Sequence, residues 1–212
     1  MLEKTFDRRW FLEGSASLAI LTSLPALAKT LPTVDEVAFD PAIPALGNPE
    51  GDVTIVEFVD YQCPYCKLCY RELAKLLAED TNIRLVMKDW PIFGDASLYT
   101  ARMVLAAAGG THYGPAVDAF MNNEKRLSKR RVDAILGDVG IDVRRLRDSL
   151  ATRQSDIDLL LARNAAQATA FSLAGTPALL IGGVLYRHGL PLADLRNAVA
   201  KARAADGAAD PA

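Results

Sequence analysis

Residues 57–70 read EFVDYQCPYCKLCY and hold all three cysteines of the 212-residue chain. Cys63, Cys66 and Cys69 follow one another at intervals of three residues. Three thiols spaced in this way suit a redox pair beside one packing residue, a metal site, or a buried packing cluster. The choice between these alternatives decides most of the chemistry.

The segments around the cysteines predict a strand, a helix and a second strand. Residues 53–59, VTIVEFV, are β-branched and apolar, which favours a strand covered on both faces. Residues 64–79 predict a helix, because apolar side chains recur there at intervals of three and four. This inward stripe consists of Cys66, Cys69, Leu73, Leu76 and Leu77. Residues 83–88, IRLVMK, predict the second strand, and this order favours a parallel pair.

The remaining pattern predicts one interrupted α/β domain. Residues 29–50 contain four prolines and are expected to form an extended lead-in. Residues 51–94 and 175–206 carry the strands and helices of the domain, with a hairpin at Gly182-Gly183. Residues 95–174 carry only helical signals and are expected to form a helical insertion.

Helix-capping residues divide the predicted insertion. Ser128 and Ser155 are candidate N-caps, because a serine hydroxyl can accept a hydrogen bond from a free N–H group of the first turn. Each serine therefore predicts the beginning of a helix.

The N-terminus predicts export. Arg8 and Arg9 form a twin-arginine pair ahead of a weakly apolar stretch, and Ala26 and Ala28 supply small residues for cleavage after Ala28. Glu13 interrupts the stretch, which argues against a permanent membrane anchor. We expect residues 1–28 to be a twin-arginine-type signal peptide.

The charge pattern argues against nucleic acid as a partner. The formal net charge is −2, whereas a nucleic-acid-binding surface is usually basic. One basic run exists, and we interpret it as a solvated helix face. It consists of Lys125, Arg126, Lys129, Arg130 and Arg131.

The position of Cys63 predicts an acidic thiol. In an exported protein two close cysteines favour a disulfide, and the predicted helix begins directly after Cys63. The helix dipole contributes at most about 2 kcal/mol, whereas lowering a thiol pKa from about 8.5 to about 4 takes roughly 6 kcal/mol. Direct hydrogen bonds from the N–H groups of Tyr65 and Cys66 are therefore expected to supply much of the difference. Cys66, one turn inside the helix, is the expected resolving thiol.

A metal site is the less favoured interpretation. A structural zinc ion takes four ligands, and one continuous helix does not readily converge three thiolates. His112 and His188 are the remaining candidate ligands, and each is isolated in the sequence. We expect no metal and interpret Cys69 as a small packing residue on the inward stripe.

Two distant motifs together carry a family resemblance. EFVDYQCPYCK, residues 57–67, and GTPALLIGG, residues 175–183, resemble the DsbA-like thiol:disulfide oxidoreductases of the bacterial cell envelope. The similarity covers nearly the whole chain after the signal, including KDWPIFG at residues 88–94. It implies a thioredoxin-like fold with an inserted all-helical subdomain, and a redox-active Cys63–Cys66 disulfide as the only redox group.

The resemblance also implies roles for four further residues. Pro177, preceded by Thr176, is expected to be cis and to leave backbone groups free to hold a substrate segment. Glu57 matches a buried acid that helps to move the proton of the resolving cysteine. Lys88 matches a lysine that can neighbour this acid, although a plain buried ion pair is an equal alternative.

The substrates implied by the resemblance are exported polypeptides with free thiols. Pro64 and Tyr65, between the two cysteines, are expected to contact them together with Thr176 and Pro177. The resemblance further implies a monomer in the periplasm that a quinone-linked membrane partner reoxidises. Pro-Tyr between the cysteines is also common in glutaredoxins, so a reductase or isomerase remains an alternative to an oxidase. The long separation of the two motifs argues against a glutaredoxin.

Overall fold

A computed structural model describes residues 31–209 of the protein. The expected signal peptide, and cleavage after Ala28, lie outside the described residues. Within the described part, no helix combines the length and apolar character needed to cross a membrane.

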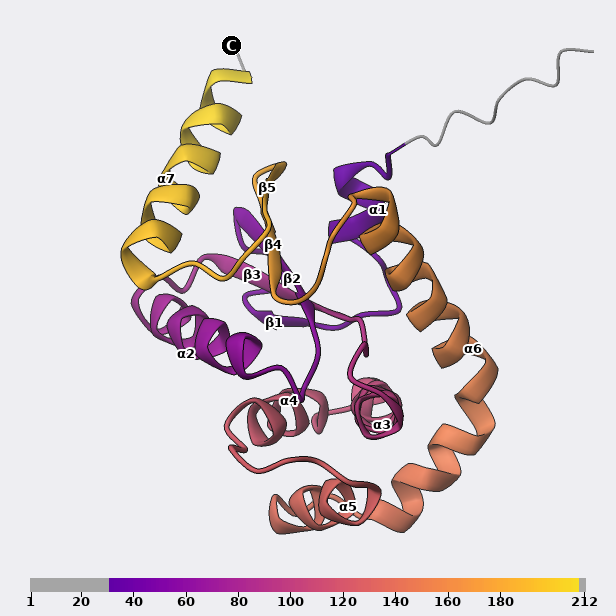
Figure 1. The fold of residues 1–212 in the computed structure, drawn as a ribbon. Helices are drawn as coiled ribbons and strands as arrows, with labels where there is room; N and C mark the ends of the chain where they lie inside the picture. Colours follow the sequence, from indigo (N-terminus) through magenta and orange to yellow (C-terminus); the bar gives the residue numbers. More distant parts are fainter. Residues whose placement is uncertain (1–30, 210–212) are drawn as a thin grey trace, which may run out of the picture.

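A five-stranded mixed sheet forms the centre of the fold (Figure 1), with the strand order β1-β3-β2-β4-β5. Only β2 and β3 pair in parallel, and all other neighbours are antiparallel. The strands are β1 (Ala45–Gly47), β2 (Val53–Val59), β3 (Ile83–Asp89), β4 (Ala178–Ile181) and β5 (Val184–Tyr186). The strands predicted at residues 53–59 and 83–88, and their parallel pairing, are confirmed.

Helices cover both faces of this sheet. Helices α2 (Pro64–Glu79) and α7 (Leu192–Ala209) pack on one face, and α1 (Val34–Ala38) and the C-terminal part of α6 (Val143–Ala170) lie toward the other (Figure 1). The predicted stripe of α2 is largely buried: Cys66, Leu73 and Leu76 are almost completely covered. This burial fixes the rotation of α2 and therefore the direction of the cysteines at its beginning.

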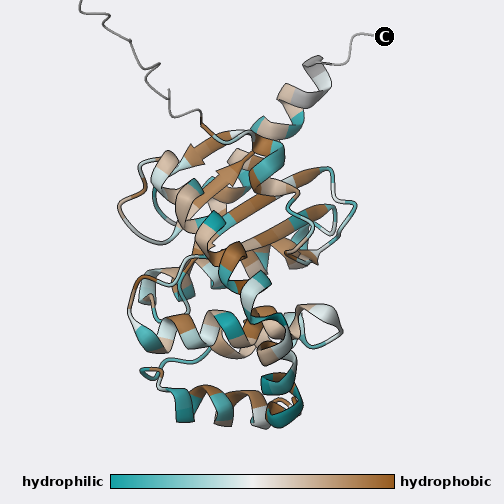
Figure 2. Ribbon diagram, turned by 90° about the vertical axis from the view of Figure 1, so that its right-hand side faces the viewer, coloured by the Kyte–Doolittle hydropathy of each residue, from teal (hydrophilic) through white to brown (hydrophobic). Residues whose placement is uncertain are grey.

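The segment between β3 and β4 is helical. It contains α3 (Asp95–Ala106), the short 3-10 helix η1 (Ala107–Gly109), α4 (Tyr113–Met121), α5 (Lys129–Asp138) and α6. α3, η1, α4, α5 and the N-terminal part of α6 form a layer beyond one end of the sheet (Figure 2). The layer is joined to the sheet by Asn164, whose side-chain amide donates to the carbonyl oxygen of Asp89 at 3.0 Å.

The structure confirms one predicted helix cap and corrects the other. The Ser128 hydroxyl accepts a hydrogen bond from the N–H of Arg131 at the beginning of α5. Ser155 lies inside α6, which begins at the N-cap Asp142 and continues without a break. The apolar stripe of α6 carries the helix past Ser155, so its hydroxyl caps nothing.

The lead-in is not uniformly extended. Thr33 and Glu36 form a capping box that begins the five-residue helix α1, because each side chain satisfies a free backbone N–H of the other. Farther along, β1 adds an antiparallel edge strand beside β3. The prolines exclude a long helix from this region, but they leave room for a short one.

Candidate active site

The segment 60–63 turns the chain from β2 into α2 and places Cys63 at the helix beginning. Cys63 is the N-cap residue, and Pro64 occupies the first helical position, where its missing N–H costs no hydrogen bond. The Asp60 carboxylate accepts hydrogen bonds from the N–H groups of Gln62, Ile92 and Phe93 and from the Ser97 hydroxyl. These contacts hold the turn against the loop after β3.

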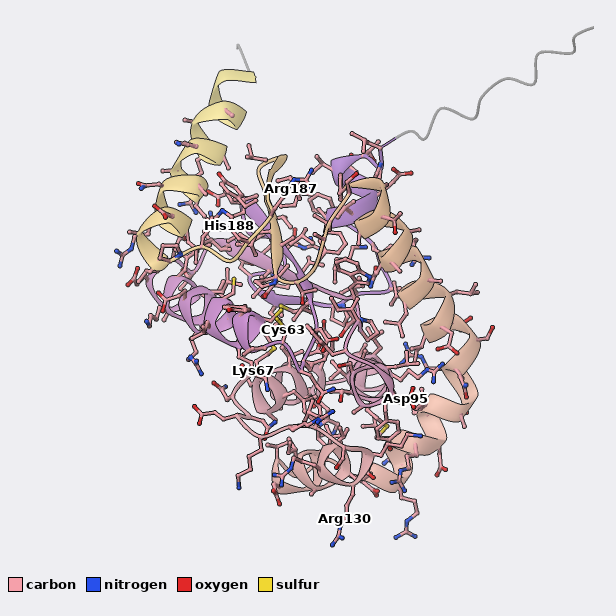
Figure 3. The ribbon with its side chains drawn as sticks, in the orientation of Figure 1. Cys63, Lys67, Asp95, Arg130, Arg187 and His188 are labelled. Atoms are coloured by element: carbon pink, nitrogen blue, oxygen red, sulfur yellow. The ribbon has the colours of Figure 1, made fainter. Side chains whose placement is uncertain are left out.

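The loop before β4 closes over the Cys63 sulfur. The Thr176–Pro177 peptide bond is cis, and the Cys63 thiol donates to the Thr176 carbonyl oxygen with an Sγ–O distance of 3.3 Å. Two segments far apart in the sequence thus meet at one sulfur. Figure 3 shows Cys63 at the junction between α2 and the layer of inserted helices.

The surroundings of Cys63 favour its thiolate. A hydrogen bond from the Cys66 thiol is the main cause that lowers the pKa of Cys63 to about 6, and burial opposes this shift. The Thr176 side chain and the N–H groups of Cys66 and Tyr65 lower the pKa further. Backbone donors contribute as the sequence predicts, but the Cys66 thiol contributes more. With a pKa near 6, about nine tenths of Cys63 is ionised at pH 7.

Cys66 has the opposite properties. It is fully buried, and burial raises its pKa, as do the hydrogen bond to Cys63 and the charge of Glu57. The two thiols therefore differ strongly in acidity. This difference suits a pair in which one sulfur attacks and leaves as a thiolate, while the other stays protonated until it is needed.

Glu57 lies beneath the cysteine pair. It is fully buried in β2, and within residues 31–209 its carboxylate oxygens make no hydrogen bond of ordinary geometry, although the Cys69 thiol lies near enough to favour the charged form. Burial raises the pKa of the Glu57 carboxyl well above its ordinary value, and the charge of Cys63 raises it further. A buried carboxyl group with a raised pKa that is close to both thiols can exchange a proton with the buried one.

Two grooves flank the cysteine pair, while the Cys63 side chain itself is only 1% exposed. The first has a volume of about 730 Å³ and is lined by Tyr65, Cys69, Thr176 and Pro177, among others. Tyr65, at its rim, is 69% exposed. The four residues predicted to contact substrate therefore surround the sulfur: Tyr65, Thr176 and Pro177 on this side, and Pro64 on the other.

The comparisons with known proteins agree with this geometry. The family model described as Thioredoxin matches residues 40–201. The chain belongs to the thioredoxin family. Its structure superposes on a thioredoxin-like oxidoreductase from Silicibacter pomeroyi DSS-3 with a TM-score of 0.77 and 35% identity, covering 81% of this chain and 98% of that one. The thiol-disulfide exchange protein alpha-DsbA2 from Wolbachia pipientis gives a TM-score of 0.74 and 28% identity, covering 79% and 90%.

Curated relatives contain a similar segment within longer proteins. The Na(+)/H(+) antiporter NhaA 1 of Salinispora arenicola is 27% identical over 159 residues, which cover 74% of this chain and 24% of that protein. The chain spans about a quarter of the length of the curated relatives that it matches. The predicted thioredoxin-like fold with inserted helices is confirmed by the family match and the structural neighbours.

The thioredoxin fold separates Lys88 from Glu57, which corrects the expected pairing. In the parallel register of β2 and β3, Glu57 lies beside Met87 and Phe58 beside Lys88. Because side chains alternate between the two faces of a sheet, Lys88 points away from the cysteines. Its Nζ atom lies 3.6 Å from Oδ2 of Asp40.

The Lys88 site is a buried ion pair. Burial lowers the pKa of Lys88 to about 8, although Asp40 favours its charged form. Asp40 also accepts two hydrogen bonds from the Arg163 guanidinium at 2.8 and 3.0 Å. These contacts join the lead-in and α6 to the sheet, which agrees with the alternative of a plain buried ion pair at Lys88.

Cys69 packs beside the first groove. A side chain at Gly189 would place its Cβ atom 3.0 Å from the Cys69 Cβ and 3.3 Å from Pro177 Cγ. Both distances are too short for ordinary contacts, so the glycine permits this close packing. Within residues 31–209, no group of three or more His, Cys, Asp or Glu side chains could hold a metal ion. His112 and His188 are both exposed, and His188 lies at the rim of the first groove.

Sequence reasoning missed three residues that shape the site. They are Asp60 and Gln62, which organise the turn before Cys63, and Gly189. Asp60 could have been found from its position at the end of a strand, where a carboxylate commonly binds free N–H groups. The long-range partners of Gln62 and Gly189 leave no local signal.

Proposed function

We propose that the protein is an exported thiol:disulfide oxidoreductase that donates the Cys63–Cys66 disulfide to polypeptide thiols. The observation that carries this proposal is the difference in acidity between the two cysteines beside cis-Pro177. The resemblance to DsbA-like proteins and the export signal expected at residues 1–28 support a periplasmic location. The redox group is the disulfide itself, and no other cofactor is proposed.

The proposed reaction has two exchange steps. A client thiolate attacks Cys63 Sγ of the disulfide, forms a mixed disulfide with it, and displaces Cys66, which takes up a proton. A second client thiolate then attacks the client sulfur of the mixed disulfide and releases Cys63 as a thiolate. The client loses two electrons and gains a disulfide, while the protein gains two electrons as one thiolate and one thiol.

Each neighbouring residue has a proposed role in these steps. The Glu57 carboxyl gives a proton to Cys66 as this sulfur leaves, and accepts it again when Cys66 attacks a mixed disulfide that has not been released. Pro64, Tyr65, Thr176 and Pro177 contact the client chain.

The other proposed partners complete the cycle. A quinone-linked membrane protein reoxidises the Cys63–Cys66 dithiol. The protein acts as a monomer both with the client and with this membrane partner.

The pKa of Cys63 predicts an intermediate reduction potential. Thioredoxin, with a cysteine pKa of about 7, has a potential of about −270 mV, and DsbA, with about 3.5, has about −120 mV. One pKa unit is about 1.36 kcal/mol, or about 30 mV for two electrons. A pKa near 6 therefore predicts a potential of about −240 mV when counted from thioredoxin and about −195 mV when counted from DsbA. Structural disulfides lie below about −300 mV, so the protein can still oxidise such clients.

Equilibration with glutathione tests the direction of the reaction. Purified protein is incubated in buffers of defined glutathione ratio, and the oxidised fraction is read from the mass of alkylated Cys63. We expect a potential between about −240 and −195 mV, less negative than that of thioredoxin. A value at or below that of thioredoxin would favour the alternative of a reductase. The acidity of Cys63 alone does not decide between the two, because Cys63 is the more acidic cysteine in an oxidase and in a reductase.

A further inference from the structure

A second groove lies on the other side of the active-site turn. It has a volume of about 640 Å³ and runs between α2 and the loop that joins α4 to α5. Pro64 and Gln62, which flank Cys63 in the sequence, line one end of it. Leu68 and Phe93 at its rim are each 52% exposed. A chain segment bound at Cys63 can therefore extend into this groove.

The loop before α5 is held against the active site by two hydrogen bonds. The Lys67 ammonium donates to the carbonyl oxygen of Asn123 at 2.5 Å, and the N–H of Leu127 donates to Oε1 of Gln62 at 3.1 Å. Both partners on the active-site side lie within four residues of Cys63. The residues between these anchors, Lys125 and Arg126 included, are consequently held beside the turn.

The groove carries an excess of positive charge. Arg71, Lys125 and Arg126 line it, all three are exposed, and none forms an ion pair within residues 31–209. Glu124 is the single acidic residue of the lining. The chain as a whole has a formal net charge of −2, so this charge is a local feature.

The structure corrects the interpretation of the basic run. Lys125 and Arg126 precede the N-cap of α5 and line the groove, whereas Lys129, Arg130 and Arg131 belong to the helix and do not line it. Figure 3 shows Arg130 directed away from Cys63, at the far side of the inserted helices. The run therefore has two parts, of which only the first faces the active site.

We propose that this groove binds acidic side chains that flank the reacting cysteine of a client polypeptide, which rests on the function proposed above. Unpaired cations beside a reacting centre accelerate the encounter with anionic partners. Residues of an extended chain are about 3.3 Å apart, so carboxylates within about three residues of the client thiol lie up to about 10 Å from it, on the side where Gln62 and Pro64 line the groove. Clients with acidic flanks are thus preferred over neutral ones.

Rate measurements with synthetic peptides test this preference. Three peptides with blocked ends carry one central cysteine flanked on both sides by Glu, Gln or Lys. The rate at which each reduces the oxidised protein is divided by its rate with a small neutral disulfide, which removes differences in peptide thiol acidity. The selectivity is the ratio of the corrected Glu and Gln rates.

Two double variants with the same change in net charge distinguish the effect of the groove cations from the effect of the overall charge of the protein. The groove variant combines Lys125→Gln with Arg126→Gln, and the control combines Lys129→Gln with Arg130→Gln. We expect the selectivity to fall about fivefold in the groove variant and to change less than about twofold in the control. The selectivity of the wild type should also decrease at 0.5 M salt, because exposed charges are screened.

The possible outcomes distinguish this inference from the proposed function. Equal corrected rates for the Glu and Gln peptides, or equal losses of selectivity in the two variants, would overturn the acidic preference while leaving disulfide exchange intact. A Gln peptide that reacts with the wild type no faster than with free oxidised glutathione would overturn the proposed function itself.

Discussion

Replacing Cys66 tests the cause of the acidity of Cys63. The Cys66 thiol is the main group that lowers the pKa of Cys63, so Cys66→Ala should raise this pKa. A hydrogen bond to a charged group contributes about 1.5–3 kcal/mol, and a thiol is a weak donor, so the lower end applies. At 1.36 kcal/mol per unit, the pKa of Cys63 should rise by about one unit, from about 6 to about 7.

Cys66→Ser is the matched variant, because the serine hydroxyl restores a donor at the same position. The pKa of Cys63 in this variant should stay within about half a unit of the wild-type value. Cys69→Ala, one turn farther along the same stripe, should also leave the pKa of Cys63 unchanged.

Alkylation by iodoacetamide gives the measurement. The rate at Cys63 is followed by peptide mass spectrometry from pH 4 to pH 9 on the reduced protein. At pH 6 the ionised fraction falls from about one half to about one tenth when the pKa rises by one unit, so alkylation of Cys66→Ala should be about fivefold slower. An unchanged pKa in Cys66→Ala, or an equal rise in the alanine and serine variants, would show that the sulfur–sulfur hydrogen bond is not the cause.

Two further substitutions separate proton transfer from structural support. Glu57→Gln should slow the attack of Cys66 on a peptide held at Cys63 by about tenfold or more. The rate of peptide release measures this attack. An unchanged rate of release would exclude proton transfer through this carboxyl. Lys88→Met should lower the free energy of unfolding by about 2 kcal/mol in urea, because Asp40 loses one of its cationic partners, while peptide release stays as in the wild type. Slower release in Lys88→Met would restore a role for this lysine in the reaction.

The parts of the fold that local pattern determines could be predicted from the sequence. The strand at residues 53–59 and the helix at residues 64–79 have the predicted bounds, because their apolar periodicity and the proline after Cys63 act within a few residues. The same locality explains the cap at Ser128. It also explains the error at Ser155, where a serine with the character of a cap lies inside a longer amphipathic helix.

Features that depend on long-range register could not be predicted. Phe58 pairs with Lys88, so the Lys88 and Glu57 side chains lie on opposite faces of the sheet. No local sequence pattern determines that strand register. The position of Arg126 in the same groove as Pro64 likewise depends on how the inserted helices fold back on α2. The cis bond at Pro177 came from the family resemblance, since most X–Pro bonds are trans.

Trapping of clients tests directly whether Cys63 exchanges with foreign thiols. Cys66→Ala, in a Cys69→Ala background and expressed with its N-terminal segment, cannot resolve a mixed disulfide, so it should accumulate adducts with exported proteins on diagonal gels. The additional replacement Cys63→Ala should abolish these adducts. If no adducts form, or if they persist without Cys63, then Cys63 does not exchange disulfides with client proteins.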